Sequence, residues 1–299
     1  MSERPGVLCA GRLYCDLVFG DLPGMPVLGE EVFAGSLTIA AGGGAYITAA
    51  YLSALGRPAG LASVFPAAPF DAVLLPELTA AGLDLAACVP AETGADPQIT
   101  AAMITGGDRA FLTRRTGAAV PAGLIAQLGE GGYGHLHIGE LATLADHPGL
   151  IAAARGAGMT ISLDCSWDAQ VLARPEAAAL VAGVDVFLPN RAEAALLSSH
   201  GALAQFAPLV VIKHGAEGAE CIAESGRHSI AAHPARVVDT TGAGDAFNAG
   251  FLDAWLDGLA PLACLEAGAA AAAVAVARFG GARGLTSLQA LRAARPAAE

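Results

Sequence analysis

The feature that most limits the folds open to this chain is an alternation, clear after Gly56, of short apolar runs with longer helical segments. Helices of this length between strands favour right-handed crossovers and a mostly parallel sheet covered on both faces. The predicted strands are Gly6–Ala10, Gly60–Phe65, His135–Ile138, Thr160–Asp164, Val184–Leu188 and Leu209–Lys213, and the predicted helices include Tyr46–Leu55, Phe70–Ala81, Pro148–Ala157 and Arg191–His200.

Two segments break this alternation, and we expect them to form a small separate β-sheet. They are Glu30–Ile39 and Leu85–Thr113. The second contains two runs of alternating β-type residues around the turn Gly106–Asp108, which is typical of a hairpin. Such a sheet could cover a bound substrate as a lid.

The last part of the chain predicts antiparallel strands within Ala219–Val238, at one edge of the main sheet, followed by two long Ala-rich helices that begin near Ala243 and Pro261. No repeat or low-complexity linker interrupts the chain. We therefore expect one domain over residues 1–299, with the lid segments at about 30–39 and 85–113 inserted in it.

The composition disfavours several classes of protein. A formal net charge of -12 argues against binding to a nucleic acid backbone, which requires clustered Lys and Arg. The hydrophobic fraction of 54% comes mainly from Ala, and the most apolar run, Leu262–Ala277, contains Glu266 and is too short to span a membrane. The N-terminal residues show no secretory signal, so we expect a cytoplasmic protein.

The six cysteines are scattered without CxxC spacing, which disfavours a zinc site or a redox pair and predicts buried free thiols. His135 and His137 alternate with apolar neighbours, so we interpret them as packing residues rather than metal ligands. Asp164 ends a predicted strand at the edge of the sheet where ligands bind, and either contacts substrate or supports a loop.

The strongest chemical signal is Val237–Gly250, VVDTTGAGDAFNAG, where a short β-type run meets a glycine-rich turn that opens into a helix. Gly242 and Gly244 allow close backbone approach. The amides of Ala243, Gly244 and Asp245 are expected to stand unpaired at the helix N-terminus, which makes an anion hole. The Asp245 carboxylate then lies beside a bound phosphoryl group, where it can accept the proton of an attacking hydroxyl. The alternative is a connecting turn with Asp245 as a helix cap.

The segment DTTGAGDAFNAG resembles the C-terminal signature of the PfkB, or ribokinase-like, family of carbohydrate and nucleoside kinases. The resemblance implies a three-layer α/β/α fold with a small β lid, amides of Gly242–Gly244 that hold the transferring phosphate, and Asp245 as the base. It also implies a monovalent cation site, with K⁺ as the candidate ion, at Asp239 and Thr241. Asn248 resembles the family's Asn near the nucleotide.

A second glycine-rich segment, from Ala40 to Gly56, resembles the family's N-terminal motif, in which Gly42, Gly43 and Gly44 let the backbone approach a polyol. A simple helix start is the alternative. Family members usually carry a sugar-binding Asn six positions into this motif, and this chain has Ile47. The missing amide removes a contact worth ~1 kcal/mol and favours a substrate without a hydroxyl there, such as a deoxy sugar, or a nucleoside.

Two acidic residues are expected to bind substrate hydroxyls. Asp16 stands where the family places an Asp that binds two hydroxyls, and an acceptor-only carboxylate suits a diol; by itself it could also be a surface turn residue. Glu140 follows the run HLHIG at the C-terminal end of a strand, and ribokinase has a sugar-binding Glu at a similar point. Arg12 could meet a substrate anion, but we favour an exposed charge.

Two further motifs resemble the nucleotide-binding parts of the family. The segment LPNRAEA matches its NxxE motif, which implies that Asn190 and Glu193 contact nucleotide phosphates and organise the waters around Mg²⁺. A plain helix cap explains the same letters. The segment VVIKHGAEGAE resembles the nucleotide loop, with Gly215 and Gly218 in its GxxG and Lys213 in front, where it either contacts phosphate or faces solvent.

Together these motifs predict an ATP-dependent, Mg²⁺-requiring kinase that phosphorylates a hydroxyl of a sugar or sugar-like small molecule. By resemblance, a homodimer through the lid is also expected. A catalytically silent sugar-binding protein is disfavoured by the intact glycine turn with Asp245. The residues also leave open a nucleoside kinase that clamps a base with Ile47, Met103 and Phe111, and a sugar-phosphate kinase that uses Arg12, Arg109, Arg114 and Arg115.

Overall fold

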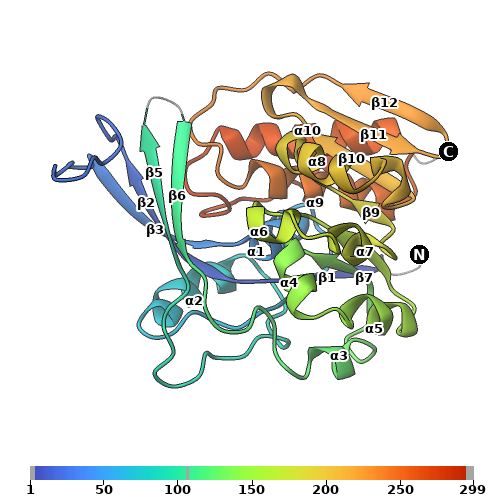
Figure 1. Ribbon diagram of the computed structural model, residues 1–299, viewed down its shortest axis with the longest axis horizontal. Coiled ribbons are helices and arrows are strands. Elements are labelled where there is room, and N and C mark those ends of the chain that lie inside the picture. Colours follow the sequence, from blue (N-terminus) through green and yellow to red (C-terminus); the bar gives the residue numbers. More distant parts are fainter. Residues whose placement is uncertain (1–3, 106–107, 294–299) are drawn as a thin grey trace.

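The computed structural model describes residues 4–105 and 108–293. These residues form a central eight-stranded sheet with the order β12-β11-β10-β9-β8-β7-β1-β4 (Figure 1). Neighbouring strands are parallel from β4 to β10, and β11 and β12 add an antiparallel edge. The strands are β1 Gly6–Ala10, β4 Ala59–Ala62, β7 Tyr133–Ile138, β8 Thr160–Leu163, β9 Val186–Phe187, β10 Leu209–Lys213, β11 Ala219–Ala223 and β12 Gly226–Ile230.

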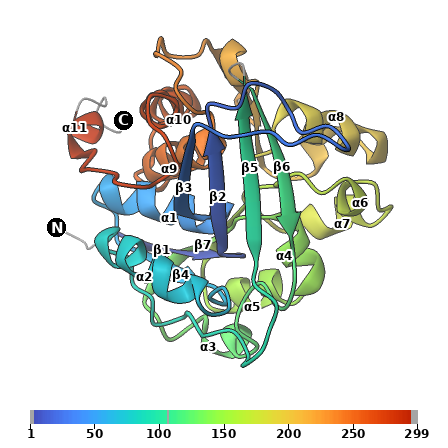
Figure 2. The ribbon, with the colours of Figure 1, turned by 90° about the vertical axis from the view of Figure 1, so that its left-hand side faces the viewer.

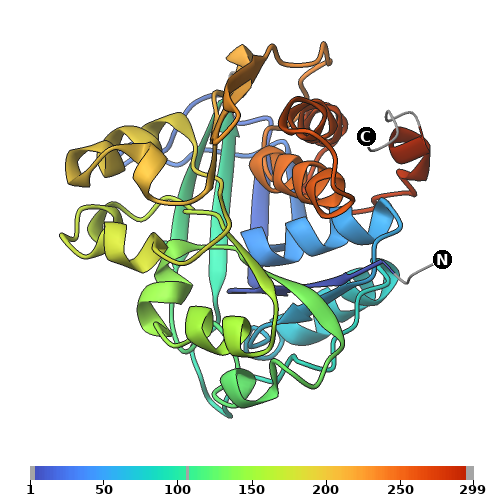
Figure 3. The ribbon, with the colours of Figure 1, turned by 90° about the vertical axis from the view of Figure 1, so that its right-hand side faces the viewer.

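Helices cover both faces of this sheet, as the sequence pattern predicts (Figure 3). Alternate residues of β1 explain why: Val7 and Cys9 join the core on one face, and Leu8 and Ala10 join the core on the other. The first face carries α1 Gly44–Ala54, α2 Phe70–Ala80, α9 Ala243–Leu256, α10 Pro261–Val276 and α11 Gln289–Ala293. The second carries α3 Leu124–Gln127, α4 Leu141–Asp146, α5 Leu150–Gly156, α6 Ala169–Leu172, α7 Ala177–Val181 and α8 Arg191–Leu197.

A second sheet of four strands, which we call the lid sheet, stands beside the core with the order β3-β2-β5-β6 (Figure 2). Its strands are β2 Tyr14–Gly20, β3 Ser36–Gly42, β5 Ile99–Thr105 and β6 Asp108–Arg114. The expected hairpin is present as the antiparallel pair β5 and β6, although Gly106 and Gly107 of its turn lie outside the described residues.

The lid sheet differs from the predicted one in its membership. No strand is predicted over Tyr14–Gly20, yet β2 pairs with both β3 and β5. Most of residues 30–35 and 85–98, which belong to the predicted lid, form turns or irregular structure. The strand β2 escapes prediction because Asp16 interrupts its apolar pattern.

The two faces of the lid sheet differ in chemistry, because successive side chains of a strand point to opposite faces. Asp16, Thr100 and Thr113 occupy paired positions on one face and line a cavity. On the other face, Leu37 and Leu112 are 55% and 69% exposed. The outer face of the lid sheet is therefore apolar and open to solvent.

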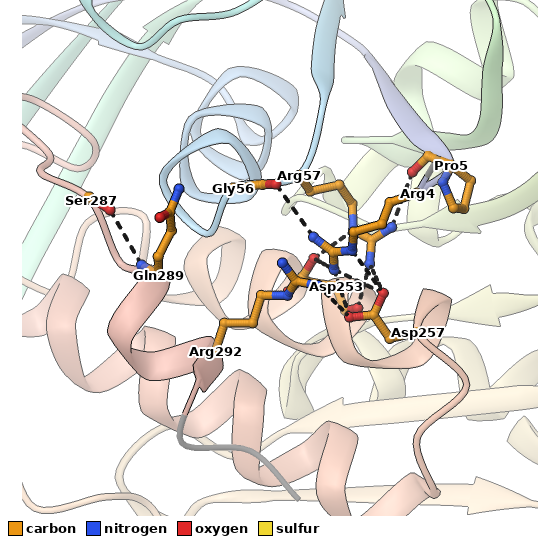
Figure 4. Close-up of polar contacts among 9 residues, drawn as sticks. All are labelled: Arg4, Pro5, Gly56, Arg57, Asp253, Asp257, Ser287, Gln289 and Arg292. Atoms are coloured by element: carbon orange, nitrogen blue, oxygen red, sulfur yellow. Dashed lines mark hydrogen bonds and ion pairs between the residues drawn. The ribbon is translucent and has the colours of Figure 1, made fainter. Parts of the chain in front are cut away.

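A dense group of ionic contacts fixes the C-terminal end of α9 (Figure 4). Arg57 donates to Asp253 Oδ1 at 2.6 Å, to Asp257 Oδ1 at 2.7 Å and to the carbonyl oxygen of Pro5 at 3.1 Å. The side chains of Arg57 and Asp253 are both completely buried. Arg4 and Arg292 add ion pairs to the two aspartates, so the contacts join α9 to the segment before β1, to the α1–β4 connection and to α11.

Several expectations about buried residues are confirmed. His135 and His137 are fully buried, and both hydrogen-bond to the Ser162 hydroxyl at 2.8 Å. All six cysteines are free thiols, and only Cys88 among them is partly exposed. In the part of the chain that the structure describes, no helix is long and apolar enough to cross a membrane.

Candidate active site

A cavity of about 1120 Å³ lies between the lid sheet and the C-terminal ends of the parallel strands. Its size and position match those of ligand sites in open α/β sheets. It is lined by most of the predicted site residues, namely Asp16, Gly43, Gly44, Glu140, Asn190, Glu193, Lys213, Gly215, Gly218, Thr241, Gly242, Ala243, Gly244 and Asp245. The predicted residues Gly42, Asp239 and Asn248 are not part of its wall and lie behind it.

The glycine-rich turn before α9 has the geometry of an anion site. Gly242 adopts a left-handed conformation with φ 73°, which favours glycine, and the helix begins at Ala243 without a side-chain cap. The Ala243 amide makes a long 3.3 Å bond to the Thr240 carbonyl, so it is less available than the sequence implies. For the amides of Gly244 and Asp245, no acceptor is seen among residues 4–105 and 108–293. Two amides with the positive end of a helix dipole thus face the cavity.

The two glycine-rich motifs meet at the Asp245 carboxylate. A Cβ atom built on Gly44 would lie 3.0 Å from Asp245 Oδ1 and 2.8 Å from the Gly139 carbonyl oxygen. Only glycine leaves that space open. Thr48, one turn into α1, donates its hydroxyl to the Asp245 carbonyl at 3.3 Å. These contacts fix the helix that carries Asp245 against the helix that follows the first glycine motif.

The environment of Asp245 suits a general base. Removal from water raises its pKa to about 7, and the Asp164 charge adds to the effect, while Lys213 and Arg109 oppose it. A carboxyl group with a pKa near neutrality can both take up a proton and release it at physiological pH. Perturbed pKa values of this kind concentrate at functional sites.

Lys213, the only lysine in the 299-residue sequence, lies at the same end of the cavity. Its ammonium group donates to Asp164 Oδ2 at 2.8 Å and to Asn248 Oδ1 at 3.0 Å. A Cβ on Gly244 would lie 3.6 Å from the ammonium nitrogen, which places this charge beside the two exposed amides. Burial acts to lower the pKa of Lys213, but the charges of Asp164 and Glu193 outweigh it and raise the pKa.

Asn248 has a supporting position rather than direct access to a ligand. It is fully buried on α9, donates to Asp164 Oδ2 and accepts from Lys213. Asp164 also accepts from the Cys165 amide at 2.7 Å. Asp164 and Asn248 therefore hold the lysine in one orientation. Asp164 also lines the cavity, so its contacts support Lys213 while substrate contact stays a prediction.

Asn190 and Glu193 form a complete capping box at the start of α8. The Glu193 amide donates to Asn190 Oδ1 at 3.0 Å, and the Asn190 amide donates to Glu193 Oε2 at 2.7 Å. Both residues also line the cavity. Burial raises the pKa of Glu193 to about 7, with a further contribution from Asp164, against the effect of Lys213. The predicted helix cap is thus present, and it engages Oε2 of Glu193 rather than Oε1.

Asp16 and Glu140 line the part of the cavity next to the lid sheet. Asp16 packs on Gly42, where a Cβ would lie 2.0 Å from Asp16 Oδ2. Burial raises the pKa of Asp16 to about 7, opposed by a hydrogen bond from Thr100. Burial likewise raises the pKa of Glu140, whose Oε1 accepts from Thr143 at 2.7 Å. The surface-turn interpretation of Asp16 is wrong, because the residue is 9% exposed inside β2.

Arg12 is buried, so the preferred interpretation as an exposed charge is wrong. It is 4% exposed and donates to Gln98 Oε1 and the Gly117 carbonyl, both at 2.8 Å. It also forms an ion pair with Glu140 at 3.4 Å. Its contacts are made within the protein and behind the cavity wall. Arg12 therefore neutralises Glu140 and fixes the chain around the lid.

Two arginines of the lid bridge to the core, and the sequence pattern predicts neither contact. Arg109 on β6 donates to the Thr240 hydroxyl in the turn before α9. Arg115, just after β6, pairs with Asp168 at 2.5 Å. Both arginines and Phe111 line the cavity, whereas Arg114 pairs with Asp96 outside it and Met103 does not reach it. The alternation 109, 111, 113 along β6 is the signal that could have identified them.

The end of the cavity lined by Lys213 continues into an apolar slot. One face of α10, with the helical spacing of Ala269, Ala272, Ala273 and Val276, forms one wall. Gly215, Gly218 and His233 lie on the opposing loops. The sequence motif predicts the two glycines but not the helix face, because a run of Ala gives no hint of which side faces a ligand.

Asp239 and Ile47, two more predicted positions of interest, have mixed surroundings. Asp239 accepts from the Thr241 amide at 2.8 Å and the Gly280 amide at 2.9 Å, while the buried Thr241 hydroxyl has no hydrogen-bond partner among the described residues. Ile47 is 3% exposed, and its Cγ2 lies 3.1 Å from a Cβ built on Gly242. Ile47 thus fills the space between α1 and the turn Gly242–Asp245, which we call the anion turn.

Comparison with known proteins identifies relatives of this chain. A model of the pfkB family of carbohydrate kinases matches residues 17–288. An uncharacterized sugar kinase of Archaeoglobus fulgidus is 38% identical over 109 residues, which are 33% of this chain and 43% of that protein. A 5-dehydro-2-deoxygluconokinase of Clostridium beijerinckii is 34% identical over 85 residues, which are 28% of this chain and 25% of that protein. The matches thus span less than half the length of these curated relatives.

The fold is shared with solved structures over nearly the whole chain. Arabidopsis thaliana ribokinase, solved with ribose and ATP, has a TM-score of 0.77 at 19% identity, with 97% of this chain and 98% of that chain covered. This likeness confirms the predicted ribokinase-like fold. Because the family model also covers most of the sequence, the chain belongs to the pfkB family of carbohydrate kinases.

Proposed function

We propose that this protein transfers the γ-phosphate of ATP to a hydroxyl group of a sugar or sugar-like molecule, with Asp245 as the general base. One observation carries the proposal. A carboxylate with a pKa near 7 lies at a helix start whose Gly244 and Asp245 amides face a large cavity. An anion site beside a proton acceptor is the arrangement that phosphoryl transfer to an alcohol requires.

In the proposed reaction, an acceptor hydroxyl bound by Asp16 and Glu140 loses its proton to Asp245. Its oxygen then attacks the γ-phosphorus in line, and the bond between that phosphorus and the bridging oxygen of ADP breaks. The amides of Gly244 and Asp245 stabilise the charge on the transferring group, and Lys213 balances the charge of the phosphates. The lid sheet excludes water, since a cleft open to solvent would favour ATP hydrolysis.

The part of the cavity lined by Asn190, Glu193 and Lys213, where we propose that ATP binds, fits Mg²⁺ held by phosphates and waters rather than by protein ligands alone. Among the described residues, no group of three or more His, Cys, Asp or Glu is arranged to hold a metal ion. Asn190 and Glu193 line the cavity near the anion turn and can bind the waters of such an ion. When bound, Mg²⁺ supplies charge neutralisation for the phosphates. The buried Thr241 hydroxyl, which has no partner in the described part of the chain, supports a K⁺ site next to Asp239.

A second candidate substrate class, a sugar acid, is favoured by one specific observation. Arg115 is the lid arginine at the acceptor end, where it acts electrostatically on Tyr14 and Glu140. Arg115 uses its Nη1 group in the pair with Asp168, and its other N–H groups can bind a substrate anion. One cation suits a carboxylate better than a phosphate dianion, and Arg12 and Arg114 do not line the cavity. The relative named 5-dehydro-2-deoxygluconokinase acts, by its name, on a deoxy sugar acid, and Ile47 suits a deoxy position.

The decisive experiment is an ADP-release assay with ATP and Mg²⁺ across neutral sugars, deoxy sugars, sugar acids, nucleosides and sugar phosphates. We expect turnover with a neutral sugar or a sugar acid. Turnover only with nucleosides would show that the acceptor is a nucleoside rather than a sugar or a sugar acid. If none of these compounds raises ADP release above the rate without acceptor, the kinase proposal is refuted. A thermal-shift screen with a non-hydrolysable ATP analogue gives an independent readout, because a ligand of the native state raises its apparent stability.

The protein's setting is proposed on the same grounds. An ATP-dependent reaction on a small molecule is expected to take place in the cytoplasm. The apolar outer face of the lid sheet, which includes Leu37, Ile39 and Leu112, supports a homodimer formed through the lid. Light scattering measures the molecular mass of the wild-type protein and of Leu112→Glu in solution. Equal masses for the two proteins would contradict a dimer formed through the lid.

A further inference from the structure

Arg109 is a lid residue that contacts the core next to the glycine-rich turn Gly242–Asp245, where we propose that the transferring phosphoryl group binds. It lies on β6, whose partner β5 pairs in turn with β2, so it belongs to the lid sheet rather than to the core. Its guanidinium donates to the Thr240 hydroxyl, two residues before Gly242. It also packs over the Phe111 ring, with 5.4 Å between the guanidinium carbon and the ring centroid. A positive charge of the lid is thereby held beside the turn that faces the cavity.

The electrostatic environment of Asp245 agrees with this position of Arg109. The Arg109 charge acts on the Asp245 carboxyl group and opposes the rise of its pKa. Such an interaction requires that the two groups are close enough to escape most solvent screening. Arg109 therefore lies near both halves of the proposed chemistry, the anion turn and the base, although it enters from a different part of the fold.

We propose that Arg109 is a catalytic residue that contacts the transferring phosphoryl group, so that transfer requires the lid to be closed. This inference rests on the proposed function. The guanidinium remains protonated throughout and donates hydrogen bonds to the γ-phosphoryl oxygens while the bond to the acceptor oxygen forms and the bond to ADP breaks. A planar fork of donors suits the equatorial oxygens of that group. Because the donor is carried by the lid, an open cleft lacks it, which slows transfer to water.

Three variants separate this role from a simple latch between lid and core. Arg109→Met removes the charge and keeps an unbranched chain of carbon and sulfur. Arg114→Met changes a nearby arginine of the same strand that pairs with Asp96 outside the cavity. Asp168→Asn removes the second contact between lid and core, to Arg115, while the amide oxygen can still accept from the amides of Gln170 and Val171.

The first measurement needs no knowledge of the acceptor. The dissociation constant of Mg²⁺-ADP is determined with and without aluminium fluoride, which mimics the phosphoryl group in flight. We expect aluminium fluoride to tighten ADP binding at least about tenfold in the wild type and in Arg114→Met, in keeping with the value of one donor to the transition state. In Arg109→Met this gain is lost, while ADP alone binds as before. A gain that survives in Arg109→Met, or is absent from the wild type, overturns the inference.

The second measurement uses the acceptor with the highest turnover in the ADP-release screen. Arg109→Met is expected to lower kcat by about 10² to 10³-fold with a much smaller change in KM for ATP. The acid limb of its pH profile should move to higher pH, because loss of the Arg109 charge raises the pKa of Asp245. The other groups that act on Asp245 are unchanged in this variant, namely Asp16, Asp164, Glu193, Lys213 and Tyr51. Arg109→Lys, which keeps the charge, should recover part of the rate.

The outcomes also distinguish this inference from the proposed function. If Asp168→Asn loses as much kcat as Arg109→Met, Arg109 acts only by closing the lid, and the inference is wrong. A kcat within about threefold of the wild type in Arg109→Met has the same meaning. A wild-type protein that phosphorylates no acceptor refutes the proposed function itself. Thermal melts of all variants ensure that a loss of rate is not a loss of folded protein.

Discussion

The two ends of helix α9 gather charged residues in different ways. At the C-terminal end, three arginines surround Asp253 and Asp257, and hydrogen bonds of 2.6 to 3.3 Å join all five side chains (Figure 4). At the N-terminal end, the amides of Gly244 and Asp245 face a cavity and the Asp245 carboxyl group has a raised pKa. We call the C-terminal end of α9, where Asp253 and Asp257 are paired with arginines, the closed end. We call its N-terminal end, where Asp245 faces the cavity, the open end.

The pKa values express this difference. Burial opposes the ionisation of Asp257, but the contacts with Arg4 and Arg57 outweigh it and the pKa falls. At Asp245, burial is the larger effect and the pKa rises to about 7. A buried carboxylate with matched partners stabilises a fold. A buried carboxylate without them lowers the stability of the fold and is available to interact with a ligand. The comparison separates the paired charges at the C-terminal end of α9 from a carboxyl group that lines the cavity.

The largest expected effect is at the open end. Asp245→Asn should lower kcat by ~10² to 10⁴-fold, because the amide cannot accept the hydroxyl proton, while ATP binding is kept. At pH 8 the variant should melt at the same temperature or a higher one. The folded protein holds the Asp245 proton more tightly than the unfolded chain, so ionisation of this group destabilises the native state as the pH rises from about 4 to 7.

Steady-state kinetics and thermal melts test this prediction together. If Asp245 were a cap of the same structural kind as the aspartates at the C-terminal end of α9, its replacement would lower the melting temperature and leave kcat unchanged. That pair of results would break the comparison.

The closed end should respond in the opposite way. Arg57→Met removes one partner of a fully buried ion pair and leaves Asp253 without its nearest cation, so the free energy of unfolding should fall by about 3–5 kcal/mol. The kcat per folded molecule should not change. Chemical denaturation measures the first quantity. Arg227→Met, whose pair with Glu220 is exposed, is the control and should unfold like the wild type.

A smaller effect is expected at Lys213, which joins the open end from β10. Lys213→Met should lower kcat/KM for ATP by about 10 to 100-fold, the value of one hydrogen bond to a charged group. Because Lys213 is the only lysine in the sequence, an acyl-phosphate derivative of ATP should acylate one lysine, identified by peptide mass spectrometry. Labelling that excess ATP does not prevent would show that Lys213 lies away from the donor phosphates.

The mildest test is the pH dependence of the wild type. The base must be deprotonated, so kcat/KM should be constant above a pKa near 7 and fall about tenfold for each pH unit below it. The charged groups that act on Asp245 are Asp16, Asp164, Glu193, Lys213 and Arg109, with Tyr51 also close. Asp16 and Glu193 have pKa values near 7 as well, so the acid limb reports several coupled groups. A profile flat down to pH 5 would contradict the assignment.

Features carried by contiguous residues could be predicted from the sequence. Each of the six predicted strands overlaps a strand of the main sheet, because parallel strands buried on both faces leave short apolar runs. The turn Gly242–Asp245 and the cap Asn190–Glu193 were predictable because each is built within a few consecutive positions. Such local patterns do not depend on the rest of the fold.

Features that join distant residues could not be predicted in this way. Arg12 has the sequence context of a surface charge, yet it is 4% exposed and contacts residues about a hundred positions away. The alternation along β6 can indicate the face on which Arg109 lies, but not the contacts of Arg109 with Thr240 and of Arg115 with Asp168, because these arise only when the lid lies on the core. The ionic cluster around Asp253 likewise joins three separate segments.

The sequence by itself determined the layered sheet, the anion turn with its carboxylate and the order of the glycine motifs, since these depend on backbone conformation and on the periodicity of apolar residues. Tertiary structure alone decided which charges are neutralised and which face the cavity. The reason is that the free energy of a charged side chain depends on burial and on partners within a few ångströms, and chain folding brings those partners together from unrelated positions.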